Sequence, residues 1–202
     1  MKVRRRMVHK LITIHPEKTV TDALNLMKQN SIRHLPVVDG HKFVGFVSEF
    51  DLREVRLLPM SEDIRVQDVM IKDPVTIGPE DSLEDAARLI FNHKIGGLPV
   101  LEHGKLVGVL TSKDILAAFI EIMGVLESSS RIDVVLGDKA EAFEEVSRII
   151  KENGGNIISV GTTTHAEKTG KKVYFYRLEK CDIDPIAAAI KKRHYEIVSV
   201  MG

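Results

Sequence analysis

Residues 45–51 read GFVSEFD, and residues 108–114 read GVLTSKD. Each stretch contains a glycine, two apolar residues, a small hydroxyl residue, two variable residues and an aspartate. The second stretch begins 63 positions after the first. A pattern that returns at such a distance indicates an internal repeat, and a repeat decides the architecture before single elements are considered.

The repeat extends well beyond these two stretches. Residues 7–52 align with residues 70–115 without a gap, and 16 of the 46 aligned pairs are identical. Most other pairs are conservative, such as Ser48 with Thr111. We therefore infer that the sequence contains a duplicated unit.

Both copies predict the element order β-α-β-β-α. A short strand (LITI or PVTI) leads to a helix over 20–30 or 83–93, where apolar residues recur on one face. Thr19 and Ser82 are the expected N-caps of these helices. Strands in HLPVVD and GLPVLE then turn into KFVGFVS and KLVGVLT, and a last helix begins near the aspartate.

The domain boundaries follow from this repeat and from the linkers. A three-stranded sheet with helices on one face has too small a core to be stable alone, so the two copies should pack together. Pro59 interrupts the segment that joins them, and a serine-rich stretch follows the second copy. We predict domains at 1–58, 59–127 and 128–202.

The C-terminal segment has a different plan. RIDVVL predicts a strand, residues 139–151 predict a helix that the glycines at 154–155 end, and two strands flank a loop at 166–170. DPIAAAIKKR predicts a second helix and YEIVSV a last strand. This β-α-β-β-α-β order is that of a ferredoxin-like domain, and the whole chain is assigned to the α+β class.

Composition limits the possible partners. Of the 202 residues, 44% are hydrophobic and 29% are charged, which is typical of a folded globular protein. The formal net charge is +0, which argues against nucleic acid or an anionic membrane as a partner. A single cysteine, Cys181, allows no internal disulfide, and no apolar run is long enough to span a bilayer. We expect a cytoplasmic protein.

The sequence shows no motif for catalysis or for metal binding. Its eight histidines are scattered and form no tight Cys/His cluster, so we expect no metal site. We find no nucleophile–base motif and no Walker-type glycine loop, and we expect that the protein is not an enzyme.

The two repeats resemble a tandem pair of CBS domains, known as a Bateman module. The LPV stretch, the G-h-h-S/T-x-x-D pattern and the duplication carry this resemblance. Residues 131–202 resemble an ACT domain, with LGDKAEAFEEVSRIIKENGGNIISV matching its loop, helix and strand. The order CBS–CBS–ACT is similar to that of the acetoin-utilisation regulatory proteins of bacteria and archaea.

The resemblance implies an adenine-nucleotide site with two aspartates as ribose ligands. In CBS pairs, the residues that match Asp51 and Asp114 accept hydrogen bonds from the ribose hydroxyls. From the residues alone, each aspartate is equally explained as a helix cap. The residues that match Ser48 and Thr111 contact the α-phosphate in the family, whereas alone they suggest a local hydroxyl–backbone bond.

The other candidate residues make the two sites unequal. Basic residues at the positions of Arg33 and His34 contact phosphates in the family, and Lys113 adds a charge near the second aspartate. The second repeat has glycines at 96 and 97 instead. We therefore expect the Asp51 site to bind phosphate better. Ile12 and Val75 match positions that contact adenine, although ordinary core packing explains them equally well.

Two further stretches have open interpretations. Residues 4–6 are all arginine and could reach a phosphate, or could simply be a solvated terminus. In the ACT-like segment, Asp138 is followed by Lys139, Ala140 and Glu141 where amino-acid-binding members carry D-R/K-P-G. This departure puts amino-acid binding in doubt and favours a role in dimerisation.

The resemblance implies a regulatory protein rather than an enzyme. We expect AMP, ADP or ATP to bind in the cleft of the CBS pair and to change the relative orientation of domains in a homodimer. The resemblance implies that this change regulates an unidentified protein in acetoin or related carbon metabolism. No other cofactor is expected. The alternative is a scaffold for oligomerisation and partner docking whose clefts stay empty.

Overall fold

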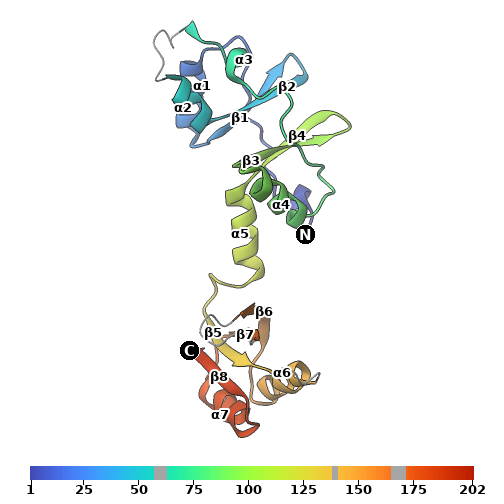
Figure 1. Cartoon of the computed structure of the whole chain (residues 1–202), viewed down its shortest axis with the longest axis vertical. Coiled ribbons are helices and arrows are strands. Elements are labelled where there is room, and N and C mark those ends of the chain that lie inside the picture. Colours follow the sequence, from blue (N-terminus) through green and yellow to red (C-terminus); the bar gives the residue numbers. More distant parts are fainter. Residues whose placement is uncertain (57–62, 138–140, 165–171) are drawn as a thin grey trace. The chain divides into compact units, whose positions relative to one another are not determined.

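The sequence repeat forms two copies of one structural unit (Figure 1). The computed structural model describes residues 1–56, 63–137, 141–164 and 172–202. These residues divide into two compact units, Met1–Leu116 and Ala117–Gly202, and the first unit contains both sets of strands from the repeats. Pro59 and the loop at 166–170 lie outside the described residues.

Each repeat contains a helix, a two-stranded antiparallel hairpin and a second helix. The first repeat contains α1 (Val20–Asn30), β1 (His34–Asp39), β2 (Lys42–Ser48) and α2 (Glu49–Arg56). The second repeat contains α4 (Leu83–His93), β3 (Gly97–Glu102), β4 (Lys105–Thr111) and α5 (Ser112–Ile122). A short helix precedes each set, η1 (Val3–Arg5) in the first and α3 (Val66–Val69) in the second. The predicted helices at 20–30 and 83–93 are confirmed.

Local sequence explains where these helices begin. The Thr19 hydroxyl accepts a hydrogen bond from the Asp22 N–H (3.0 Å), and the Asp22 carboxylate accepts one from the Thr19 N–H (3.2 Å). Ser82 accepts the equivalent bond from the Asp85 N–H (3.0 Å). Both predicted N-caps are therefore confirmed, and each cap satisfies backbone groups that the first helical turn leaves free.

The predicted opening strands are reduced to single bridges. Ile14 forms one parallel bridge with Val37, through bonds from the Ile14 N–H to the Pro36 carbonyl (3.0 Å) and from the Val38 N–H to the Ile14 carbonyl (2.9 Å). Proline has no N–H, so Pro36 cannot donate the next bond that would extend the ladder toward Ile12. The second repeat has the same single bridge, Ile77–Val100, and the same proline.

The two repeats exchange their leading segments. The antiparallel bridges that join them are Lys2–Ser82, Val8–Val109, Thr19–Arg65 and Phe46–Ile71. In each bridge, a residue that leads into one repeat pairs with the body of the other. This exchange explains why the copies need each other, as the small core of each had suggested.

The exchange also explains why methionine at 7 and 70 and glycine at 45 and 108 are the same in both repeats. A Cβ atom on Gly108 would lie 2.6 Å from the Met7 sulfur, and one on Gly45 would lie 2.6 Å from the Met70 sulfur. Each methionine therefore packs directly on the backbone of the other repeat, where only glycine leaves room for it.

The C-terminal unit is built on a four-stranded antiparallel sheet. Its elements are β5 (Ser129–Val135), α6 (Ala142–Glu152), β6 (Ile157–Thr164), β7 (Lys172–Glu179), α7 (Asp184–Lys192) and β8 (Glu196–Met201). The strands lie in the order β6-β7-β5-β8, with every neighbouring pair antiparallel. The predicted β-α-β-β-α-β order is confirmed, and helix α6 begins at Ala142, after residues 138–140, which lie outside the described part.

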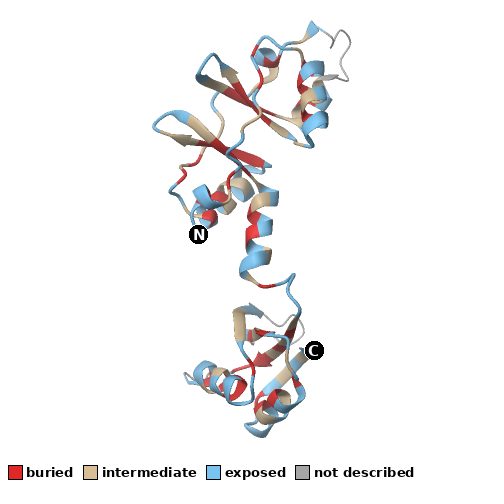
Figure 2. Ribbon diagram, turned by 180° about the vertical axis from the view of Figure 1, so that it is seen from behind, coloured by how far each residue is buried: buried red, intermediate tan, exposed pale blue. Residues whose placement is uncertain are grey.

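Buried residues of both helices and of the sheet form the core of this unit (Figure 2). The fully buried side chains that pack with Tyr176 of β7 include Val146 and Ile150 of α6 and Ile186 and Ile190 of α7. The helices therefore share one face of the sheet, as the apolar spacing of their sequences predicts.

Candidate functional site

Two cavities lie between the repeats, and each is lined by residues of both. One has a volume of about 500 Å³ and contains Asp114 and Thr111; we call it the Asp114 cavity. The other has a volume of about 600 Å³ and contains Asp51 and Ser48; we call it the Asp51 cavity. Both volumes fall within the range of roughly 300–1,000 Å³ that is usual for small-molecule sites.

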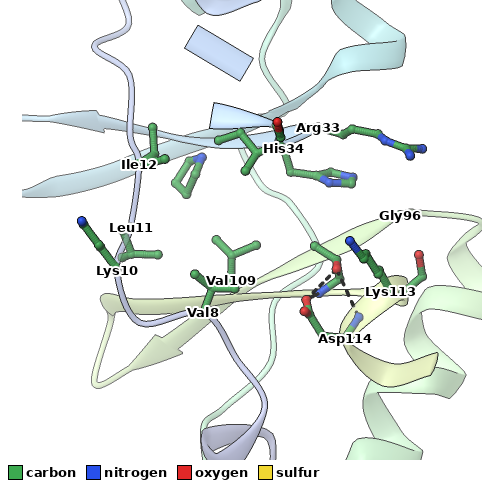
Figure 3. A pocket seen from close by; sticks show the side chains of 15 residues that line it. Val8, Lys10, Leu11, Ile12, Arg33, His34, Gly96, Val109, Lys113 and Asp114 are labelled. Carbon is green, nitrogen blue, oxygen red and sulfur yellow. Dashed lines mark hydrogen bonds between the residues drawn. The ribbon is translucent and has the colours of Figure 1, made fainter. Parts of the chain in front are cut away.

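Asp114 is held rigidly at the start of α5 (Figure 3). Its Oδ2 accepts hydrogen bonds from the Thr111 hydroxyl (2.6 Å) and from the Thr111 N–H (2.8 Å). The Asp114 N–H donates back to the Thr111 hydroxyl oxygen (3.4 Å). Both bonds use Oδ2, so Oδ1 has no hydrogen-bond partner among the described residues and can accept bonds from a ligand.

Asp51 has nearly the same geometry at the start of α2. The Ser48 hydroxyl donates to Asp51 Oδ2 (2.6 Å), and the Asp51 N–H donates to the Ser48 hydroxyl oxygen (3.3 Å). The sequence had suggested that each aspartate caps its helix. In both helices, the residue before the first turn is the hydroxyl residue, and the aspartate is the third helical residue, as in a capping box.

This arrangement changes the expected role of the two hydroxyl groups. Ser48 and Thr111 each donate their single hydroxyl proton to the neighbouring carboxylate. A hydroxyl can donate only one hydrogen bond at a time. Each hydroxyl therefore orients its aspartate when the cavity is empty, and it must rotate away from the carboxylate before it can donate to a phosphate.

Apolar residues also line both cavities. Ile12 lines the Asp114 cavity, and Val75 lines the Asp51 cavity. Because Pro36 stops the bridge at Ile14, the Ile12 carbonyl has no backbone hydrogen bond among the described residues. Each cavity thus combines a carboxylate with an apolar wall and an extended backbone segment.

His34 lies at the centre of the site, and it lines both cavities. Its ring is stacked on Phe46, with 5.7 Å between the ring centroids and an interplanar angle of 13°. A Cβ atom on Gly96 would lie 2.8 Å from His34 Nε2, and one on Gly97 would lie 3.4 Å from the ring. Gly96 therefore makes room for the histidine of the other repeat, and Gly97 lies in contact with its ring.

Burial controls the protonation of this histidine. Desolvation lowers the pKa of His34 below its usual 6.5, nearby Arg33 lowers it further, and Asp51 opposes both by raising it. The imidazole is therefore mostly neutral near pH 7. A bound anion would favour its protonated form.

The charged residues that line the two cavities are distributed differently from the expectation. Arg33 and His34 line both cavities, although the sequence had assigned them to the Asp51 site alone. Lys113 lines only the Asp114 cavity, as does Lys10, which the sequence analysis missed. The Asp114 cavity therefore has three cationic side chains against one carboxylate, with the histidine counted as neutral.

The charges that line the Asp51 cavity are more evenly balanced. It has three cationic side chains and three carboxylates, and one of the cations, Arg53, is paired with Glu49 (2.7 Å). The third carboxylate is Asp73, at the position that aligns with Lys10. That opposite-charge pair in the alignment was the signal that could have identified Lys10. The lining of the Asp114 cavity is therefore the more positive of the two, whereas the sequence had favoured the Asp51 site for phosphate.

Arg4 has a different role from both of those considered for residues 4–6. Arg4 forms ion pairs with Glu80 (2.7 Å) and Glu102 (2.6 Å), and Lys2 also pairs with Glu80. Hydrogen bonds from Lys2 and Arg4 hold the pKa of Glu80 at about 2. Arg4 therefore docks the leading segment onto the second repeat, and neither Arg4 nor Arg5 lines a cavity.

The described residues lack two features. They include no group of three or more histidine, cysteine or acidic side chains placed to hold a metal ion. They also include no helix that is both long enough and apolar enough to span a membrane.

The fold and the cavities define a paired α+β module whose two repeats enclose two cavities of small-molecule size. The family model of the CBS domain matches residues 3–58 and 66–121. The chain therefore belongs to the CBS domain family, with its two domains in tandem.

Solved structures of similar proteins cover the same region. CBSX2 from Arabidopsis thaliana, solved in complex with AMP, is 33% identical, and the match covers 60% of this chain and 97% of that one with a TM-score of 0.55. A Vibrio cholerae protein assigned to acetoin utilization (AcuB) is 31% identical, with 62% and 94% covered and a TM-score of 0.56.

The curated relatives include larger proteins. The inosine-5'-monophosphate dehydrogenase of Korarchaeum cryptofilum is 38% identical over 109 residues, which are 54% of this chain and 22% of that enzyme. The chain spans only 22–28% of the first three dehydrogenases that it matches. The similarity therefore covers a minor part of each of these enzymes.

Proposed function

We propose that this protein is a non-catalytic regulatory module that binds adenine nucleotides in the two cavities of its CBS pair. The observation that carries the proposal is the rigid carboxylate at each helix start, with one free oxygen beside an apolar wall and a cationic group. A nucleotide has matching parts, namely a vicinal diol, a purine and a phosphate. The similar protein solved with AMP supports the class of ligand.

The carboxylates are assigned to the ribose. Oδ1 of Asp114 and Oδ1 of Asp51 accept the ribose hydroxyls, because Oδ2 of each is already used by Thr111 or Ser48. Hydrogen bonds to a charged acceptor are about twice as strong as neutral ones. The fixed carboxylate also loses little conformational freedom when the ligand binds.

The adenine and phosphate groups are assigned to the two ends of each cavity. Ile12 and Val75 pack against the purine, and the Ile12 carbonyl is available to the exocyclic amino group. Arg33, His34 and Lys113 contact the phosphates, since guanidinium and ammonium groups are strong phosphate donors. Thr111 and Ser48 join the α-phosphate only after their hydroxyl groups rotate.

The C-terminal unit is proposed to act as an ACT-like dimerisation domain. Its element order and strand order support this assignment, and Glu141 stands where amino-acid-binding members have glycine. In this proposal the protein is a homodimer, and nucleotide binding shifts the balance between two dimer geometries. The similarity to the Vibrio cholerae protein favours a role in acetoin or related carbon metabolism.

Thermal unfolding with added ligands tests the proposed function. AMP, ADP, ATP and S-adenosylmethionine would be compared, and at least one adenine nucleotide should raise the melting temperature as its concentration rises. Mass spectrometry of small molecules released from the denatured protein would identify what the protein retains from cells. No shift with any of the four ligands would favour the scaffold alternative.

Isosteric variants test the aspartates. Asp114→Asn and Asp51→Asn each remove a charged acceptor worth about 1.5–3 kcal/mol, so each should weaken nucleotide binding by about tenfold or more. Asp85→Asn is the matched control, because Asp85 has the same helical position and accepts the Ser82 hydroxyl (2.7 Å) but lines neither cavity. Equal losses in all three variants would show a structural effect only.

A further inference from the structure

The two cavities share one cationic side chain, Arg33, and the imidazole of His34. The duplication aligns Arg33 and His34 with Gly96 and Gly97, so only one repeat supplies charge at this position. The close approach of His34 to both glycines places the aligned positions side by side at the centre of the site. Arg33, His34 and Gly96 consequently line both cavities.

Packing restricts the residue that position 96 can carry. His34 occupies the space that a side chain at position 96 would need, since a Cβ there would lie 2.8 Å from Nε2. A symmetric pair with a basic residue in both repeats would therefore require a different packing at the centre.

Arg33 is available to either cavity. Its side chain is exposed, and it forms no ion pair within the described part of the chain. Its carbonyl accepts a hydrogen bond from the Glu49 N–H (2.8 Å), which fixes the backbone at the start of α2 and leaves the side chain free to move. Figure 3 shows Arg33 and His34 on the opposite side of the Asp114 cavity from Lys113 and Asp114.

We propose that the two cavities compete for Arg33, so that a polyphosphate nucleotide in the Asp114 cavity weakens binding of a second anionic nucleotide in the Asp51 cavity. This inference rests on the proposed nucleotide-binding function. One guanidinium cannot form bidentate bonds with two phosphate groups in different cavities at once. The Asp114 cavity prevails because Lys10 and Lys113 also line it.

The competition depends on ligand charge. Adenosine has no phosphate and should fill both cavities independently. AMP adds a modest charge, and ATP adds more, so the coupling should increase along this series. The protein would then hold one nucleoside polyphosphate together with one uncharged nucleoside more readily than two polyphosphates.

Calorimetric titration of single-cavity variants tests the coupling. Asp51→Asn and Asp114→Asn give the affinity of each remaining cavity, and the wild-type protein gives the two stepwise affinities. For ATP, the second wild-type step should be weaker than the isolated Asp51 cavity by about tenfold, within the usual range for coupled sites. For adenosine, the second step should equal the isolated affinity. Raising the salt concentration should reduce the ATP effect.

Substitution of the shared residue tests the cause. Arg33→Gln should weaken ATP binding in both single-cavity variants, whereas Lys113→Gln should weaken it only where the Asp114 cavity is intact. Adenosine binding with equal coupling, or an Arg33→Gln effect in one cavity only, would overturn the inference while the proposed function stands. No binding of any adenine ligand would overturn the proposed function itself.

Discussion

The exchange of leading segments predicts an energetic coupling between Met7 and Gly108. Met7 is 5% exposed, and its sulfur packs where a Cβ on Gly108 would lie, at 2.6 Å. Such a separation is well below normal contact, so Gly108→Ala must displace Met7. Met7→Ala removes the sulfur and Cγ that a new methyl group would meet.

The expected magnitudes follow from these contacts. Gly108→Ala overpacks a buried site and should lower the free energy of unfolding by about 1–3 kcal/mol. Met7→Ala leaves a cavity and should lower it by about 2–5 kcal/mol. In the double variant, the alanine at 108 enters part of that cavity. We expect the loss to be smaller than the sum by about 1–2 kcal/mol, as is found for residues in contact.

Urea unfolding of the four proteins measures this coupling, and the pseudo-symmetry supplies the control. Gly45 packs on Met70 in the same way as Gly108 packs on Met7. Met7→Ala combined with Gly45→Ala should therefore be additive within about 0.5 kcal/mol. The account of the exchange is refuted if the Met7–Gly108 pair is additive, or if Met7 couples equally to both glycines.

Three further predictions concern protonation and a buried hydroxyl. The pKa of Glu80 is about 2 in the folded protein and 4.5 ordinarily. Its stabilising contribution is therefore complete above pH 4.5 and disappears as the pH falls toward 2. Glu80→Gln should make the free energy of unfolding depend less on pH in that window. The pKa of His34 is lower in the folded protein than its usual 6.5, so on acidification this histidine binds its proton more readily in the unfolded chain. The free energy of unfolding should therefore fall from pH 7 to pH 5.5. His34→Gln should remove that slope. Ser130, which is 0% exposed, accepts from the Cys181 N–H (3.2 Å) and donates to the Cys181 carbonyl (3.1 Å), so Ser130→Ala should cost about 1–3 kcal/mol in urea unfolding; an unchanged midpoint would contradict this.

The sequence was sufficient to predict the elements whose cause is local. Helices α1 and α4 begin directly after Thr19 and Ser82, because capping and apolar spacing depend only on neighbouring residues. The strand that was predicted for LITI does not form, for a reason that lies elsewhere in the chain. Its apolar residues suit a strand, but its partner contains Pro36, which cannot continue the ladder.

The charge distribution of the site could not be predicted from the sequence in the same way. Aligned positions seemed to belong to separate sites, so Arg33 was assigned to one and Gly96 to the other. Packing of the repeats brings these positions together, and Arg33 and Gly96 each line the two cavities. Lys10 was missed because it precedes the expected strand, although its aligned partner, Asp73, has the opposite charge.

The most direct test of the central claim is a crystal structure of the protein with AMP at saturating concentration. We predict ribose hydroxyls within about 2.5–3.0 Å of Asp114 Oδ1, which is ordinary O–H···O geometry. The purine should lie against Ile12, and the phosphate should lie near Arg33 and Lys113. AMP bound outside both cavities, or cavities that stay empty at saturation, would contradict the account.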